Sequence, residues 1–123
     1  MRSSRAAVDA YVTKDRSVIR ELMHPSVQGN RAQSLAEATV PPGAVTLLHR
    51  HAVTEEIYHF TAGEGWMTLG DERFEVRAGD TVCISPGLAH RLENTGSSDM
   101  VLLCSCSPAY CHDDTELLTE DAP

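Results

Sequence analysis

Short runs of alternating apolar and polar residues fill the middle of the chain. They predict strands at about residues 34–40, 44–51, 56–61, 64–69, 73–77, 81–84, 89–93 and 99–106. Turn signals separate these runs, among them Pro41-Pro42-Gly43, Gly70-Asp71 and Asn94-Thr95-Gly96. Many short strands at this spacing are typical of a β-sandwich or barrel, so we expect an all-β domain.

The segments before and after these runs have weaker patterns. Residues 1 to 10 are expected to be weakly ordered or helical, and Tyr11–Thr13 to form a short strand. Asp15 or Ser17 would cap a short helix that runs through Leu22. We therefore divide the chain into an N-terminal extension with a short strand or helix (1–34), a barrel (35–107) and an acidic C-terminal segment (108–123).

The chemistry of the chain is concentrated in two of the predicted strand regions. His49 and His51 are two residues apart, so on a strand they point to the same face and can bind one ion. Val45 and Leu47 would share that face, with Thr46 on the other. Residues 52 to 54 form a bend that can reset the facing, after which either Glu55 or Glu56 must point inward.

A third imidazole comes from a distant part of the sequence. His90 follows the turn signal Ser85-Pro86-Gly87, so a different strand would carry it. Three imidazoles and one carboxylate form a ligand set for a divalent first-row metal. Manganese, iron(II) and nickel suit these mixed nitrogen and oxygen ligands, and zinc is a further candidate.

At these residues the chain resembles the cupin superfamily, as a small single-domain member. Its first motif, a glycine, His-x-His, a glutamate and a second glycine, matches Gly43, His49, His51, Glu56 and Gly63. The second motif is a glycine, Pro-x-Gly, a histidine and an asparagine. It matches Gly79, Gly87, His90 and Asn94, although Ser85 stands where the first proline is expected.

The resemblance implies a jelly-roll β-barrel of the cupin type, with one divalent metal ion per chain in its mouth. By this likeness His49, His51, Glu56 and His90 are the metal ligands, and Glu56 rather than Glu55 points inward. The family includes dioxygenases, isomerases, lyases and non-catalytic binders, so the fold does not determine the reaction. We expect a metal-dependent enzyme of dioxygenase or isomerase/lyase type; the alternative is a metal-containing module that binds or senses a small ligand.

Tyr58 is the candidate catalytic residue. It lies two residues after Glu56, so a regular strand would place its phenol beside the metal, as a general acid or base or to orient the substrate. The simpler interpretation is core packing. His59 would face away from the metal, and a role near the pocket is open for His112.

Composition narrows the partners. A chain of 123 residues is one domain by size, and its net charge of −8 argues against nucleic acid and anionic membranes. The N-terminus lacks the apolar core of a secretory signal, so we expect a cytoplasmic protein that binds a small-molecule substrate. We also expect a homodimer, because pairing would cover exposed strand edges; light scattering would test this.

The four cysteines are expected to be reduced thiols in that compartment. Cys104 and Cys106 share one strand face, and with Cys111 and His112 they form a second possible zinc set. Their spacing fits small core residues, or a thiol in the pocket, better than it fits a zinc site.

Overall fold

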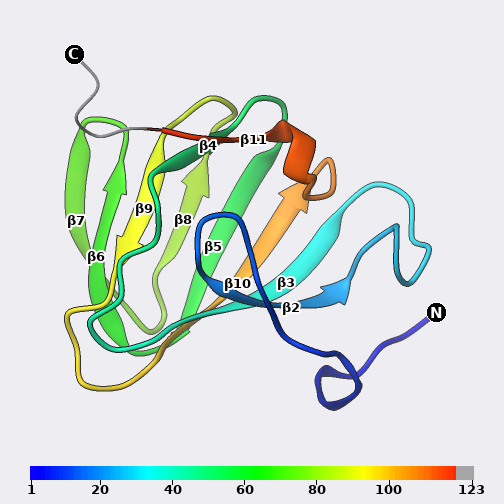
Figure 1. The fold of residues 1–123 in the computed structure, drawn as a ribbon, viewed down its shortest axis with the longest axis horizontal. Coiled ribbons are helices and arrows are strands. Elements are labelled where there is room, and N and C mark those ends of the chain that lie inside the picture. Colours follow the sequence, from blue (N-terminus) through cyan, green and yellow to red (C-terminus); the bar gives the residue numbers. More distant parts are fainter. Residues whose placement is uncertain (119–123) are drawn as a thin grey trace.

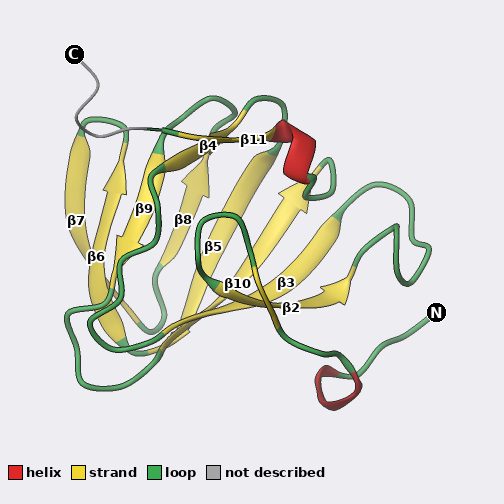
Figure 2. Ribbon diagram, viewed as in Figure 1, coloured by secondary structure: helices red, strands yellow, loops and turns green. Residues whose placement is uncertain are grey.

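Two antiparallel β-sheets face each other in the computed structural model, which describes residues 1–118 (Figure 1 and Figure 2). The larger sheet has the strand order β1-β2-β3-β10-β5-β8, and the smaller has the order β11-β4-β9-β6-β7. The strands are β1 (Tyr11–Val12), β2 (Val18–Met23), β3 (Ser34–Val40), β4 (His49–His51), β5 (Glu55–Ala62), β6 (Glu64–Leu69), β7 (Glu72–Arg77), β8 (Thr81–Ile84), β9 (His90–Glu93), β10 (Met100–Ser107) and β11 (Thr115–Leu117). Two 3-10 turns, η1 (Arg5–Ala7) and η2 (His112–Asp114), complete the described part, so the predicted all-β jelly roll is confirmed.

The core lies between the two sheets. Strand alternation points one face of each strand inward, as in β5 and β10, where buried and exposed positions alternate. Phe60, Met67, Met100 and Leu102 are among the most deeply buried large side chains. Between β5 and β6 Gly63 adopts a φ of +82°, and a Cβ atom there would lie 2.5 Å from the carbonyl oxygen of Asp99, so glycine is required.

The helix predicted from Asp15 or Ser17 to Leu22 is wrong. Residues 18 to 23 form β2, which pairs with β1 on one side and with β3 on the other. Pairing with β3 and burial of Ile19 override the local helical signal. The carboxylate of Asp15 does accept a hydrogen bond from the backbone N–H of Ser17, but it closes a turn and does not begin a helix.

The predicted strand at 44–51 is also shorter in the structure. Only His49–His51 is regular, and Val45 makes an isolated bridge to Glu93. The irregular residues between them change the facing, so the prediction for this stretch was wrong. Thr46 is buried and lies on the pocket side, whereas Val45 is 42% exposed.

Segments from both ends of the chain cover one end of the barrel. The loop between β1 and β2 lies over the strands in Figure 1, and its Asp15 carbonyl accepts a hydrogen bond from Leu47 N–H at 2.8 Å. β11 pairs with β4, so the chain beyond the last long strand supports the strand that carries His49 and His51. Lys14, in the β1–β2 loop, connects this loop to β11 by donating a hydrogen bond to the Thr115 carbonyl at 2.7 Å. Within residues 1–118, no helix has the length and apolar character needed to cross a bilayer.

Candidate metal centre

The four predicted ligands come from three strands and are all buried. β4 supplies His49 and His51, β9 supplies His90, and β5 supplies Glu56. Glu56 points inward and Glu55 is exposed, as the motif predicted. His49 and His90 occupy paired positions of β4 and β9, so the register of the smaller sheet brings the distant histidine to the pair.

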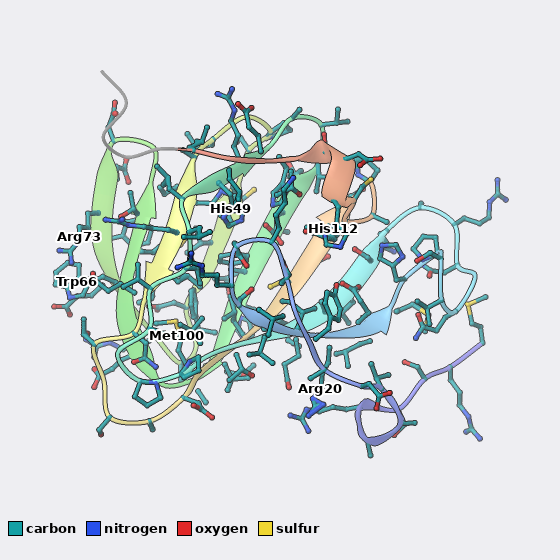
Figure 3. All side chains as sticks on the ribbon, viewed as in Figure 1. Arg20, His49, Trp66, Arg73, Met100 and His112 are labelled. Carbon is teal, nitrogen blue, oxygen red and sulfur yellow. The ribbon has the colours of Figure 1, made fainter. Side chains whose placement is uncertain are left out.

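The three imidazoles form one compact cluster. One ring nitrogen from each of His49, His51 and His90 lies within 4.8 Å of the other two. The Glu56 Oε1 atom lies 3.2 Å from His51 Nε2 and 3.5 Å from His90 Nε2. Figure 3 shows His49 in the interior near the N-terminal loop, far from Arg73 and Trp66 on the outer edge of the smaller sheet.

Each imidazole is oriented through its other nitrogen. The Nδ1 atoms of His49 and His90 lie 2.9 Å from the carbonyl oxygens of Leu47 and Leu88, which can only accept. His51 Nδ1 lies 3.0 Å from Thr115 Oγ1, whose own proton goes to a backbone carbonyl. In the neutral form of each ring Nδ1 therefore carries the proton, which leaves the Nε2 lone pair free to bind an ion.

Two buried atoms of the cluster have no hydrogen-bond partner among the described residues. They are Glu56 Oε1 and His90 Nε2, which are 3.5 Å apart. Buried polar atoms are normally paired, so two acceptors that face each other fit a site that binds a cation. Three imidazoles and a carboxylate fit a divalent metal, and the cluster could hold one.

The electrostatics of the site also favour ligand chemistry. Burial, together with the neighbouring His90, lowers the pKa of His49 to about 4, so the ring is neutral at pH 7. Burial alone would raise the pKa of Glu56. With a proton on Nε2, His51 and His90 outweigh this effect and lower that pKa to about 2, and a cation in place of those protons would act in the same direction. Neutral imidazoles and an ionised carboxylate are the forms that bind metals.

A small cavity of about 50 Å³ opens beside the cluster. Its wall includes Tyr58, the candidate catalytic residue, whose ring centre lies 5.9 Å from that of His90. Burial raises the pKa of the Tyr58 phenol well above its usual value, so it remains protonated. The same side chain belongs to the hydrophobic core, so Tyr58 has both of the environments that the sequence left open.

The cysteines lie near the pocket. Cys104 and Cys106 line the cavity, and Cys106 Sγ donates to Glu56 Oε2 at 3.2 Å. Burial raises the pKa of both thiols. Cys111 is exposed, and within residues 1–118 the three-histidine group is the one cluster suited to a metal, so the possible zinc set of the cysteines with His112 does not assemble.

Sequence reasoning missed three residues of the site. Asp15 Oδ2 lies 3.6 Å from His49 Nε2, Tyr110 has its ring centre 5.8 Å from that of His51, and Thr115 orients His51. All three lie outside the motifs, and Asp15 carried only a local capping signal. His112 does not line the cavity, but its Nδ1 lies 2.9 Å from the hydroxyl of Tyr110, which does.

Fold and centre together define a small barrel with a three-histidine site in its mouth. Residues 36–106 match the model of the cupin domain, and the chain belongs to the cupin family.

The similarity to one sequence relative extends beyond the residues of the barrel. The chain is 50% identical over 111 residues to an uncharacterized protein of Methanocaldococcus jannaschii, which covers 90% of this chain and 89% of the relative. It is 34% identical over 84 residues to an oxalate-binding protein of Thermotoga maritima, with 68% of this chain and 65% of the relative covered.

Solved structures support the fold alone. A predicted oxalate decarboxylase from Thermotoga maritima superposes with a TM-score of 0.75 at 24% identity, covering 88% of this chain and 99% of that chain. A nucleoside dehydratase superposes with a TM-score of 0.77 at 14% identity, covering 96% and 90%. Neighbours with such different names do not determine the reaction of this chain.

Proposed function

We propose that this protein is a metal-dependent cupin enzyme that acts on a small metabolite at a divalent ion. His49, His51, His90 and Glu56 hold the ion, and the cavity beside them receives the substrate. The observation that carries the proposal is the convergence of the buried, unpaired Glu56 Oε1 and His90 Nε2 atoms with two further imidazoles whose Nδ1 atoms are already bonded.

The cavity limits the substrate to a small molecule. A volume of about 50 Å³ is well below that of sites for drug-sized ligands, which run to several hundred cubic ångströms. A divalent ion in this position would polarise a carbonyl or hydroxyl oxygen of the bound substrate. Manganese, iron or nickel is the expected ion, and isomerase/lyase and dioxygenase chemistry are the two reaction classes that fit.

We assign to Tyr58 the role of hydrogen-bond donor to the substrate. A phenol keeps its proton at neutral pH, and burial raises the pKa of Tyr58 further, so it can donate a hydrogen bond to a substrate oxygen in the cavity. Tyr58→Phe would remove that donor and keep the packing of the ring. We expect turnover to fall by about 100-fold or more while metal content stays unchanged.

A second function is favoured by one relative. The Thermotoga maritima protein with 34% identity carries the name oxalate-binding protein, which describes binding and not turnover. By analogy, this chain would hold a small ligand on the metal without transforming it. Tyr58→Phe would then weaken ligand binding and there would be no turnover to lose.

The metal centre is tested by elemental analysis of untagged protein purified without chelator. We expect about one manganese, iron or nickel ion per chain. His59→Ala is the matched control for a histidine variant of the cluster such as His51→Ala. His59 is an exposed histidine on β5 that forms a hydrogen bond with Thr81 and does not touch the cluster. A wild-type protein that takes up no divalent metal, even when Mn²⁺, Fe²⁺ or Co²⁺ is supplied, would disprove the proposal.

The reaction class is tested on the loaded protein. Oxygen uptake with pools of small metabolites identifies dioxygenase chemistry, and product formation without oxygen use identifies an isomerase or lyase. Ligand-dependent stabilisation against heat with neither signal would support the binding function.

A further inference from the structure

The loop between β1 and β2 brings a second carboxylate to the three-histidine cluster. Asp15 is 8% exposed, and its Oδ2 atom lies 3.6 Å from His49 Nε2. Glu56 approaches the cluster at His51 and His90, so the two carboxylates approach different imidazoles. Asp15 comes from outside the matched family segment of residues 36–106.

The loop is built to hold this carboxylate in place. The other oxygen of Asp15, Oδ1, accepts hydrogen bonds from the Ser17 backbone at 3.0 Å and from the Ser17 hydroxyl at 2.6 Å. Arg16 adopts a φ of +76°, a conformation that costs energy in a residue with a side chain. Anchoring one oxygen leaves the other directed at the imidazole.

A cation would make the contact between Asp15 and His49 favourable. His49 Nδ1–H faces the Leu47 carbonyl, so a neutral ring presents the Nε2 lone pair to the carboxylate, and two acceptors repel each other. Two ligand atoms that each lie about 2.0–2.2 Å from one ion are about 2.8–3.6 Å apart. The 3.2 and 3.5 Å from Glu56 to two Nε2 atoms and the 3.6 Å from Asp15 to His49 Nε2 fall in this range. Of the three imidazoles Asp15 contacts that of His49 alone, and the group of ligand atoms that all lie within 4.8 Å of one another holds the three imidazoles only, so binding of an ion would draw both carboxylates closer to it.

We propose that Asp15 is a fifth protein ligand of the metal and that it closes the centre to dianions. This inference rests on the proposed metal site and deepens it. Two carboxylates cancel the two charges of a divalent ion, so the centre has no net charge to attract an anion. Among the described residues that line the cavity there is no lysine or arginine, while Glu21 adds a third carboxylate.

The substrate class follows from these charges. A dianion of the oxalate type would have to displace Asp15 and enter a cavity lined by acidic side chains. A small neutral metabolite with a carbonyl or hydroxyl oxygen meets no such barrier. This chain is therefore expected to differ in ligand from the oxalate-binding relative, even though it shares 34% of its residues over the aligned part.

The test uses Co²⁺, whose visible absorption responds to the number and type of its ligands. Wild-type protein, Asp15→Asn and Asp15→Ala are titrated with Co²⁺, followed by oxalate. Asp9→Asn is the matched control, because it makes the same chemical change at an exposed position of the same N-terminal segment. Circular dichroism confirms that each variant is folded, and Asp15→Asn keeps the Oδ1 acceptor for Ser17.

We expect both Asp15 variants to bind Co²⁺ about 10- to 100-fold more weakly, with a changed spectrum, and Asp9→Asn to match the wild type. Oxalate should change the spectrum of Co²⁺-loaded Asp15→Asn at concentrations that leave the wild-type spectrum unaltered. A wild-type spectrum that responds to oxalate as strongly as the variant does would overturn the inference, as would unchanged Co²⁺ affinity and spectrum in both variants. A wild-type protein that binds no Co²⁺ would instead remove the metal site itself, and with it this inference.

Discussion

Two parts of the molecule meet at the centre, and they contribute differently. The barrel strands β4, β5 and β9 supply the three histidines and the glutamate that the sequence motifs contain. The flanking segments, which are the β1–β2 loop and the chain after β10, supply Asp15, Tyr110 and Thr115. In our proposal the barrel part holds the ion, whereas the flanking part orients His51 and lines the cavity beside the cluster. The family likeness is therefore informative about the ion and says little about the ligand.

The strongest test of the barrel part is His51→Ala. The variant loses one imidazole ligand, and with it a link between β4 and the ion. Metal content should therefore fall to near zero, and the melting temperature of the loaded protein should drop to that of the metal-free protein. Elemental analysis and thermal unfolding measure both. Full metal occupancy in His51→Ala would mean that the ion binds elsewhere.

The next test compares two adjacent glutamates. Glu56→Gln should weaken metal binding by about 10- to 100-fold or more, because it removes the buried charge beside His51 and His90. Glu55→Gln changes an exposed residue and should leave the affinity intact. Equal effects in the two variants would show that net charge, and not coordination, is responsible.

A test of the flanking part is Thr115→Val. The variant removes the hydroxyl that accepts from His51 Nδ1, and we expect about a tenfold loss of metal affinity. Thr81→Val is the matched control, because Thr81 makes the same type of contact with His59 on the outside of the larger sheet. If both variants keep wild-type affinity, the C-terminal segment does not orient the ligand.

The smallest expected effect is a pH dependence of the metal-free protein. The pKa of His49 is about 4 in the folded state and about 6.5 in the unfolded chain, so the unfolded chain binds the proton first as the pH falls. The free energy of unfolding should therefore decrease from pH 6.5 to 4, by about 1–3 kcal/mol. The charge of Asp15 raises the pKa of His49. Asp15→Asn should therefore lower the pKa of His49 further and make the free energy of unfolding fall more between pH 6.5 and 4. Urea unfolding at several pH values measures it.

Local patterns were sufficient for the barrel. Alternation predicted most of the strands between residues 34 and 107, although 44–51 is regular only at His49–His51. The family motif, and not alternation, selected Glu56 as the inward residue of β5 and placed His90 near the His49–His51 pair. Patterns failed where pairing with a distant strand decides the outcome, as in β2, or where the backbone is irregular, as at Thr46. Asp15 could not be assigned, because its role depends on a loop fold that brings it to a residue 34 positions away. The homodimer and the cytoplasmic location remain predictions.

The anchoring of His51 by Thr115 also has a consequence for the order in which the protein folds. His49 and His51 are near neighbours in the chain, so they can capture an ion while the polypeptide is still unfolded. His90, Thr115 and Asp15 join only after distant segments have come together, which is slow in a β topology dominated by non-local pairing. The spectrum of an ion added during refolding would therefore change in stages, and its final form would report that the barrel has closed.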